Sequence, residues 1–225
     1  MQIENRLHLF MTGTDTDVGK TRFGAALLAA WRLSGLPAIG LKPIATGSRA
    51  DALRLQEAAR TPLSLSEINP FFFRRPAAPA LAAEAEGREL ALPEVEARLR
   101  PLLARFSCAI VEGVGGWKTP LTSAEAVSDL AARLGLPVVV VARCRLGVLN
   151  HALLTVESIR AAGLRTAGIL LNGFPETSPE TLAETAALLR RLTGLPVAGF
   201  PDADALAADP PDWLLPPFRR SEGRR

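Results

Sequence analysis

Short apolar runs rich in β-branched residues alternate with longer stretches of helical pattern along most of this chain. The runs are apolar throughout rather than alternating in polarity, which is typical of strands buried on both faces of a sheet. Several helical stretches end in a glycine shortly before the next run, and glycine is common just beyond a helix C-terminus. The alternation predicts an α/β fold with one doubly wound, mostly parallel sheet flanked by helices. A chain of 225 residues can bury such a core as a single domain, 1–225.

The same pattern gives approximate bounds for each element. Strands are expected at residues 7–11, 38–41, 108–111, 138–141, 168–171 and 197–200. Helices are expected at residues 20–33, 51–59, 94–104, 124–134, 149–161 and 179–192. Residues 69–79, rich in Pro, Phe and Arg, and the chain from Ala207 onward are expected to be irregular surface connections.

The least ordinary segments of the chain each follow an expected strand directly. In a parallel sheet, the loops after the strands share one edge, and ligands bind outside the carboxyl ends of the strands. We therefore expect these segments to converge on one site: residues 13–21, 42–48, 112–120, 142–151, 172–176 and 201–204.

Residues 13–21 read Gly-Thr-Asp-Thr-Asp-Val-Gly-Lys-Thr between an expected strand and an expected helix. Backbone N–H groups of such a loop and the helix N-terminus can hold a polyphosphate, with Lys20 on the outer phosphates and the Thr21 hydroxyl on Mg²⁺. The match to the usual phosphate loop is imperfect, because Thr14 stands where the first glycine normally lies. Asp15 and Asp17 would repel phosphate, so they indicate a nearby Mg²⁺ or an amine-bearing ligand.

Lysine is scarce in this chain. Only Lys20, Lys42 and Lys118 occur, against 23 arginines. Arginine thus serves wherever a general positive charge suffices, and a retained lysine suggests a need for a compact ammonium group. We therefore treat Lys20 and Lys42 as candidate catalytic residues.

Charge and composition argue against several functional classes. The net charge is +3, but residues 218–225 hold four arginines and one glutamate, so the rest of the chain is neutral. A neutral body is poor evidence for a nucleic-acid groove, and the basic tail is expected to be a mobile terminus. No apolar run approaches the roughly 18–20 residues of a membrane span, no secretory pattern begins the chain, and Cys108 and Cys144 do not make a disulfide framework. We expect a cytoplasmic protein without membrane or nucleic-acid partners.

Several segments together resemble the dethiobiotin synthetase family. The phosphate loop has that family's nonstandard glycine spacing, and further similar segments follow in order over about residues 7–205. These segments are 42–47 (Lys-Pro-Ile-Ala-Thr-Gly), 51–53, 111–116 (Val-Glu-Gly-Val-Gly-Gly), 119–121, 146–152 and 168–172.

The resemblance implies a reaction, with ATP as co-substrate and Mg²⁺ as cofactor. Members of the family close the ureido ring of dethiobiotin from 7,8-diaminononanoate and CO₂, through a carbamate and a carbamic-phosphoric anhydride, in biotin biosynthesis. Lys42 matches the family's active-site lysine, which would stabilise the carbamate and the charge developing on phosphate, while Lys20 would serve the β- and γ-phosphates.

The resemblance also implies ligands for the metal and the nucleotide. Thr21, Asp51 and Glu112 match the Mg²⁺ ligands, although the position of Asp51 at a helix start also fits a simple N-cap. Asn172 matches the residue that reads adenine. The implied nucleotide contacts are Asp17, Val18, Gly19, Lys20, Thr21, Arg22, Asp51, Glu112, Gly113, Val114, Gly115, Asn172, Gly173, Phe200, Pro201 and Asp202.

Substrate contacts follow from the same resemblance. In the family, the segment matching residues 146–150 comes from the neighbouring subunit and holds the substrate's carboxylate at a helix N-terminus, which implies a homodimer with a shared active site. The implied substrate contacts are Thr46, Thr14, Gly116, Thr119, Leu146, Gly147 and Asn150. The chain departs from the family in one place, since only Arg49 and Ala50 separate Ser48 from Asp51, where a longer lid can occur.

Two other functions remain open on the sequence. A cobyrinic acid amide synthase-like ligase would need a glutamine-hydrolysing domain, for which this chain has no room. A P-loop switch ATPase that partitions DNA or places a septum carries a signature lysine early in its phosphate loop, and Asp15 stands at that position here.

Overall fold

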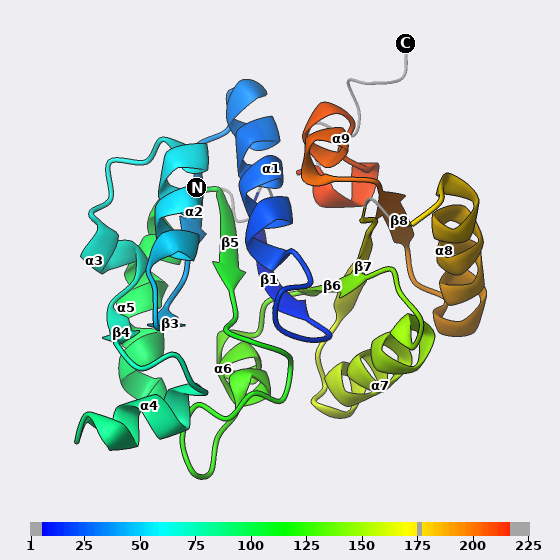
Figure 1. Ribbon diagram of the computed structural model, residues 1–225. Coiled ribbons are helices and arrows are strands. Elements are labelled where there is room, and N and C mark those ends of the chain that lie inside the picture. The colour runs from blue at the N-terminus through cyan, green and yellow to red at the C-terminus, as the bar shows by residue number, and fades with distance from the viewer. Residues whose placement is uncertain (1–5, 175–176, 217–225) are drawn as a thin grey trace.

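Six parallel strands form the central sheet of the computed structural model, which describes residues 6–174 and 177–216 (Figure 1). All neighbouring strands pair in parallel. The predicted doubly wound α/β fold is confirmed. In spatial order the strands are β2 (Ala38–Leu41), β5 (Cys108–Glu112), β1 (Leu7–Gly13), β6 (Val138–Arg143), β7 (Thr166–Asn172) and β8 (Val197–Phe200).

Alternate residues of the central strand pack into two different cores, one on each face of the sheet. Leu9 and Met11 of β1 belong to the core that also holds Trp31 of α1, whereas Phe10 belongs to the other core. This explains why the strands are apolar on both faces. Helices α1 (Lys20–Leu33) and α9 (Ala203–Ala208) cover the first face together with the 3₁₀ turn η2 (Asp212–Leu214). Helices α5 (Leu92–Arg105), α6 (Val127–Leu134), α7 (Val148–Ala161) and α8 (Pro179–Thr193) cover the second.

Residues 69–79, predicted to be irregular, instead help to build a second small sheet. Strand β4 (Phe71–Phe73) pairs in parallel with β3 (Ile44–Thr46), which follows the end of β2. Two short helices, α3 (Leu65–Ile68) and α4 (Pro79–Ala85), flank this pair, and α2 (Ala50–Ala59) lies beside β2. Strands of three residues are too short for their polarity pattern to show, which is why the prediction was wrong here.

Two further element bounds differ from the predictions. Helix α6 begins at Val127 instead of residue 124, because the Thr122 hydroxyl accepts hydrogen bonds from the N–H groups of Ala124 and Glu125 and holds them in a turn. The chain after Ala207 is not wholly irregular, since it completes α9 and forms η2, where the Trp31 indole donates to the Leu214 carbonyl at 2.9 Å.

The basic tail at residues 218–225, predicted to be mobile, lies outside the described residues. In the described part of the chain, none of the helices has the length and apolar character needed to cross a membrane.

Candidate functional site

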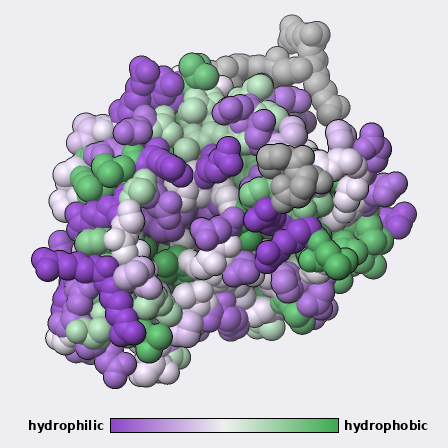
Figure 2. Space-filling view, in the orientation of Figure 1, coloured by the Kyte–Doolittle hydropathy of each residue, from purple (hydrophilic) through white to green (hydrophobic). Residues whose placement is uncertain are grey.

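A cavity of about 360 Å³ opens at the carboxyl end of the sheet, between the phosphate loop, the segment after β2, and α2. Lys20 and Lys42 both line it, so the two scarce ammonium groups share one cavity as predicted. This end of the molecule faces the viewer in Figures 1 and 2, where hydrophilic side chains surround the middle of the face. The lining residues are Thr16, Asp17, Gly19, Lys20, Thr21, Arg22, Lys42, Ala45, Thr46, Ser48, Asp51, Arg54, Val114 and Gly115.

The phosphate loop curls tightly over the start of α1. Gly19 precedes the helix with a φ of 100°, and a side chain there would collide with the Asn172 amide. The Lys20 ammonium folds back and donates to the Asp15 carbonyl at 2.9 Å. A Cβ on Gly13 would lie 2.8 Å from that carbonyl oxygen and 3.1 Å from Lys20 Nζ, so both glycines are needed for this close packing.

Lys42 is fully enclosed in a network of acidic and hydroxyl groups. Its Nζ lies 2.6 Å from Glu112 Oε1, 3.0 Å from the Gly113 carbonyl and 3.3 Å from Asp51 Oδ2. The Thr21 hydroxyl donates to the same Glu112 oxygen at 2.7 Å. The network thus joins the phosphate loop to the ends of β2 and β5 and to α2, which are distant in sequence.

The segment that the sequence left irregular holds the backbone of Lys42 in place. The Lys42 N–H donates to the Ile68 carbonyl at 3.0 Å, and the Asn69 amide donates to the Lys42 carbonyl at 2.7 Å. Asn69 is completely buried, as is Glu112. In the sequence, a single asparagine next to Pro70 and three phenylalanines could have indicated a buried amide with a supporting role, and our prediction missed it.

Burial and neighbouring charges move the pKa values of the two lysines in opposite directions. Burial, reinforced by repulsion from Lys42, lowers the pKa of Lys20 from 10.5 to about 8. Burial also favours the neutral form of Lys42, but attraction to Glu112 and Asp51 outweighs it and raises the pKa of Lys42. For Asp51, burial opposes ionisation, yet the Lys42 charge prevails and lowers the pKa of that carboxyl group.

The oxygen atoms around Lys42 also suit a small divalent cation. Glu112 Oε2 is buried without a hydrogen-bond partner, and the Thr21 hydroxyl and the Asp51 carboxylate lie on the same network. Within the described ranges, no group of three or more His, Cys, Asp or Glu side chains could hold a metal alone. Mg²⁺ takes few protein ligands and completes its shell with water and phosphate, so one hydroxyl and two carboxylates fit it.

Comparison of the sequence with known proteins identifies relatives of this chain. The AAA domain family matches residues 8–207. The ATP-dependent dethiobiotin synthetase BioD of Anaeromyxobacter dehalogenans strain 2CP-C is 48% identical over 198 residues, covering 86% of this chain and 89% of that protein. The chain belongs to the dethiobiotin synthetase family. The synthetases of Cellvibrio japonicus and Yersinia pestis bv. Antiqua strain Angola are each 40% identical, covering 88% and 85% of this chain and 93% and 82% of the relatives.

Among solved structures, the cell division protein FtsY of Thermotoga maritima superposes with a TM-score of 0.53 at 15% identity. The match covers 91% of this chain and 65% of the FtsY chain. At that identity the likeness shows the fold alone. The curated relatives therefore favour the synthetase family over both alternatives that the sequence left open.

Of the remaining predicted site residues, Thr46 lines the cavity, and the others lie outside its lining. A Cβ on Gly116 would lie 3.5 Å from the carbonyl oxygens of Gly13 and Thr14. The Gly116 N–H donates to the Thr119 hydroxyl at 2.8 Å. Gly116 and Thr119 thus lie against Thr14 of the phosphate loop, whereas Thr46 lines the cavity itself.

The expected adenine contacts also lie together. The Asn172 amide donates to the Val18 carbonyl at 3.0 Å, and the Gly173 N–H donates to the Phe200 carbonyl at 2.7 Å. Pro201 follows, and Asp202 caps α9 by accepting a hydrogen bond from the Ala205 N–H at 2.9 Å. These residues lie next to the phosphate loop, but they do not line the cavity described above.

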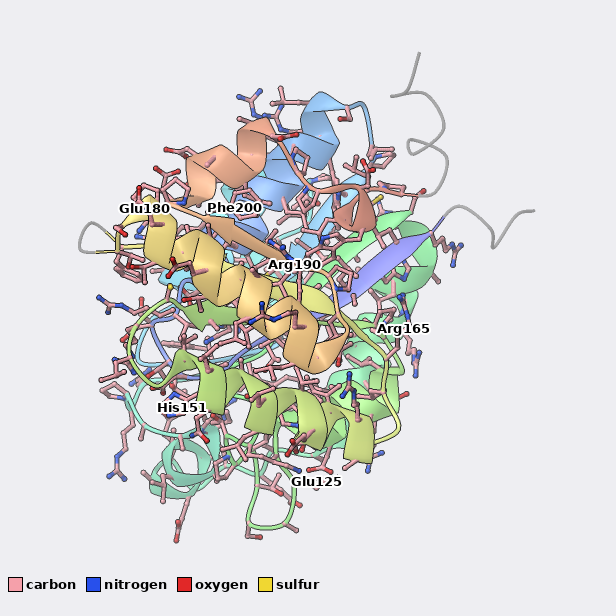
Figure 3. All side chains as sticks on the ribbon, turned by 90° about the vertical axis from the view of Figure 1, so that its right-hand side faces the viewer. Glu125, His151, Arg165, Glu180, Arg190 and Phe200 are labelled. Atoms are coloured by element: carbon pink, nitrogen blue, oxygen red, sulfur yellow. The ribbon has the colours of Figure 1, made fainter. Side chains whose placement is uncertain are left out.

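The segment before α7 lies beside the phosphate loop, since the Arg145 guanidinium is 3.5 Å from Asp15, but it does not line the cavity of its own chain. Leu146, Gly147 and Asn150 are exposed, and the described lining of the cavity contains none of them. Figure 3 shows His151 on the first turn of α7, at the same end of the sheet as Phe200 and opposite to Arg165. Hydrophobic residues gather on this side of the face in Figure 2. Leu146 is fully exposed and Leu154 is 56% exposed.

Two interpretations of single residues, Asp51 and Asp15, change with the structure. Asp51 is not the N-cap of α2, because the helix begins one residue earlier, at Ala50, whose N–H is held by the Ser48 hydroxyl. Asp15 is partly offset by Arg145, whose guanidinium lies 3.5 Å from it. Lys118 is exposed and donates to Ser128 at 3.2 Å, outside the lining of the cavity.

Proposed function

We propose that this chain is an ATP-dependent dethiobiotin synthetase that closes the ureido ring of 7,8-diaminononanoate with CO₂ and releases ADP and phosphate. The observation that carries the proposal is the shared cavity of Lys20 and Lys42, since the reaction must bring one anion against another. Fixed positive charges in a site of low water content stabilise such an approach by several kcal/mol.

The proposed sequence of bonds is as follows. One substrate amine attacks CO₂ and loses a proton, which gives a carbamate. A carbamate oxygen attacks the γ-phosphorus, the bond to the bridging oxygen breaks, and ADP leaves. The second amine then attacks the carbamate carbon, and phosphate departs as the ring closes. Lys42 would contact the carbamate and the transferred phosphoryl group, while Lys20 would hold the β- and γ-phosphates.

Thr21, Asp51 and Glu112 would hold Mg²⁺ in this proposal. Bound Mg²⁺ offsets the charge of the phosphates and draws electron density from the phosphorus. Of these two carboxylates, Glu112 Oε1 and Asp51 Oδ2 contact the Lys42 ammonium, while Glu112 Oε2 has no hydrogen-bond partner. Lys42 and a divalent cation therefore compete for Glu112 and Asp51. The flexible stem of the lysine would let its ammonium turn toward the carbamate when the carboxylates take the metal.

A homodimer with a shared site is the second part of the proposal. The substrate-binding residues expected just before and at the start of α7 do not line the cavity of their own chain. Leu146 before this helix and Leu154 within it are exposed. A test mixes Lys42→Ala chains with Asn150→Ala chains under conditions of subunit exchange. Partial recovery of activity is expected if one site draws on both subunits, and its absence in exchanged dimers would contradict the shared site.

We also propose that the described α/β unit is one domain and that it acts in the cytosol, where its two buried free cysteines, Cys108 and Cys144, would remain reduced.

The decisive assay measures ADP release in Mg²⁺ and bicarbonate with and without 7,8-diaminononanoate. Release that depends on the diamine supports the proposal. Release that ignores the diamine but responds to DNA or to membrane vesicles would instead indicate a switch ATPase.

A further inference from the structure

Two arginines line the phosphate cavity without a partner for either guanidinium. Arg22 comes from the first turn of α1 and Arg54 from α2, and both side chains are exposed. Among the described residues, neither guanidinium makes an ion pair or a hydrogen bond. Other exposed arginines do pair with an acidic neighbour, as Arg100 does with Glu96 at 2.8 Å. Two unpaired guanidinium groups in one cavity indicate that their partner is a ligand.

The two helices present their polar groups to the cavity in matching order. Helix α1 offers the Thr21 hydroxyl and then Arg22, and α2 offers Asp51 and, one turn later on the same face, Arg54. Each helix therefore contributes one oxygen suited to a metal and one guanidinium. A guanidinium fork binds two phosphate oxygens at once, which an ammonium group does not.

The arginines decide the sign of the cavity's charge. Lys20 and Lys42 balance Asp17 and Asp51 in the lining, and Glu112, buried behind Lys42, brings this set to a net −1. Such a set repels a polyphosphate that arrives without its metal. Arg22 and Arg54 bring the total to +1, and arginine stays charged at any physiological pH.

Arg22 and Arg54 lie on the side of the cavity nearest α9. Both line a second hollow of about 800 Å³ between α1, α2 and α9, which Lys20 and Lys42 do not line. Glu57 and Asp204 border this hollow but make no ion pair with either arginine in the part of the chain that the structure describes. Arg22 and Arg54 therefore lie where the phosphate cavity opens toward α9. This helix directly follows residues 200–202, which are expected to contact the nucleotide.

We propose that Arg22 and Arg54 form a phosphate-binding pair that holds the polyphosphate of the nucleotide on the side away from Lys42 and captures it even without a metal. Arg54 is then a nucleotide-binding residue that neither the phosphate-loop motif nor the family resemblance assigned. The inference rests on the proposed use of ATP at this site.

The test measures equilibrium binding of ATP, ADP and adenosine to the full chain in excess EDTA, at several salt concentrations. Relative to wild type, Arg54→Ala should weaken ATP binding about fivefold, and the Arg22→Ala, Arg54→Ala double variant about twentyfold, with a flatter salt dependence. Arg54→Lys should recover part of the loss, because it restores the charge without the fork. Adenosine binding should not change, since adenosine has no phosphate.

Arg165→Ala is the matched control, because Arg165 is an exposed arginine at the opposite end of the sheet (Figure 3). Thermal unfolding of each variant checks the fold. ATP binding by the double variant within twofold of the Arg165→Ala control would overturn the inference, as would an equal loss of adenosine binding. Nucleotide binding by wild type that requires a metal would overturn the capture role alone. Wild type that binds no nucleotide under any condition would contradict the proposed function itself.

Discussion

The phosphate loop and the end of β2 each bury a lysine, with opposite electrostatic results. Burial, reinforced by repulsion from Lys42, lowers the pKa of Lys20 in the phosphate loop to about 8, and the ammonium donates to a backbone carbonyl. Lys42 after β2 meets two carboxylates, and its pKa rises. Both side chains are almost completely buried, so burial alone does not distinguish them. The difference indicates that Lys20 is suited to pair with an anionic ligand, whereas Lys42 is already paired with two carboxylates of the protein.

The same difference has opposite consequences for stability. The charged form of Lys20 is disfavoured in the folded protein below about pH 8, and this penalty is relieved between pH 8 and its ordinary value of 10.5. Lys42 stabilises the fold below its ordinary pKa, and this contribution is lost as the pH rises through the higher folded value. Four experiments test this contrast between Lys20 and Lys42, beginning with the one for which we expect the largest change.

Lys42→Ala should lower turnover about a thousandfold, because its charge is needed chiefly in the transition state. Nucleotide binding should be retained, since Lys20 and the loop N–H groups remain. Diamine-dependent ADP release and equilibrium ATP binding check the two halves of this statement, with Lys118→Ala as the control. Loss of ATP binding in parallel with turnover would make Lys42 a second phosphate lysine.

Glu112→Gln should lower the free energy of unfolding by about 3 kcal/mol at pH 7, because it leaves a buried ammonium without its closest partner. Asp51→Asn should cost less than about 1 kcal/mol, since the Asp51 side chain is 46% exposed while that of Glu112 is 0% exposed. Urea unfolding of both variants measures the difference. Equal losses would mean that Lys42 does not depend on the buried carboxylate.

ATP binding should weaken about tenfold per pH unit above pH 8, as Lys20 loses its proton. In Lys42→Ala the midpoint should move upward, because the repulsion from Lys42 is part of what lowers the pKa of Lys20. Titrations of ATP between pH 7 and pH 10, with adenosine as the uncharged control, follow both effects. A wild-type midpoint near the ordinary lysine value would remove the contrast between the two sites.

Lys42→Gln should bind Mn²⁺ about fivefold more tightly than wild type in the absence of nucleotide, because the competing ammonium is gone from the carboxylates. The electron paramagnetic resonance signal of free Mn²⁺ measures this affinity without any turnover. Lys118→Gln should leave it unchanged. Unaltered or weaker Mn²⁺ binding in Lys42→Gln would show that the lysine and the cation use different oxygens.

The sequence predicted the sheet and the site loops because both depend on patterns that are local. Each expected strand was found, and the phosphate loop, Lys42 and Asp51 lie around one cavity as parallel topology requires. The contact between Lys42 and Glu112 spans 70 residues, so no local pattern could show it. The β3–β4 pair and the buried Asn69 behind Lys42 depend likewise on distant partners.

Arg54 was missed for a different reason. On the sequence it is one of 23 arginines, and what sets it apart is its place in the cavity without an ion-pair partner among the described residues. Asp51 was open to two interpretations because a carboxylate near a helix start can cap the helix. The position of Ala50 decided that question.

The hydrogen bond from Trp31 to the Leu214 carbonyl ties the far end of the chain to the helix that begins with Lys20. Trp213 fills the space above Gly168 on β7, where any side chain would clash with it. Proteolytic cleavage after residue 202 would therefore expose the Trp31 indole and remove α9, which forms one wall of the hollow beside Arg54. A shortened product would be expected to aggregate and to lose ligand binding together, so intact mass should be confirmed before any weak preparation is judged inactive.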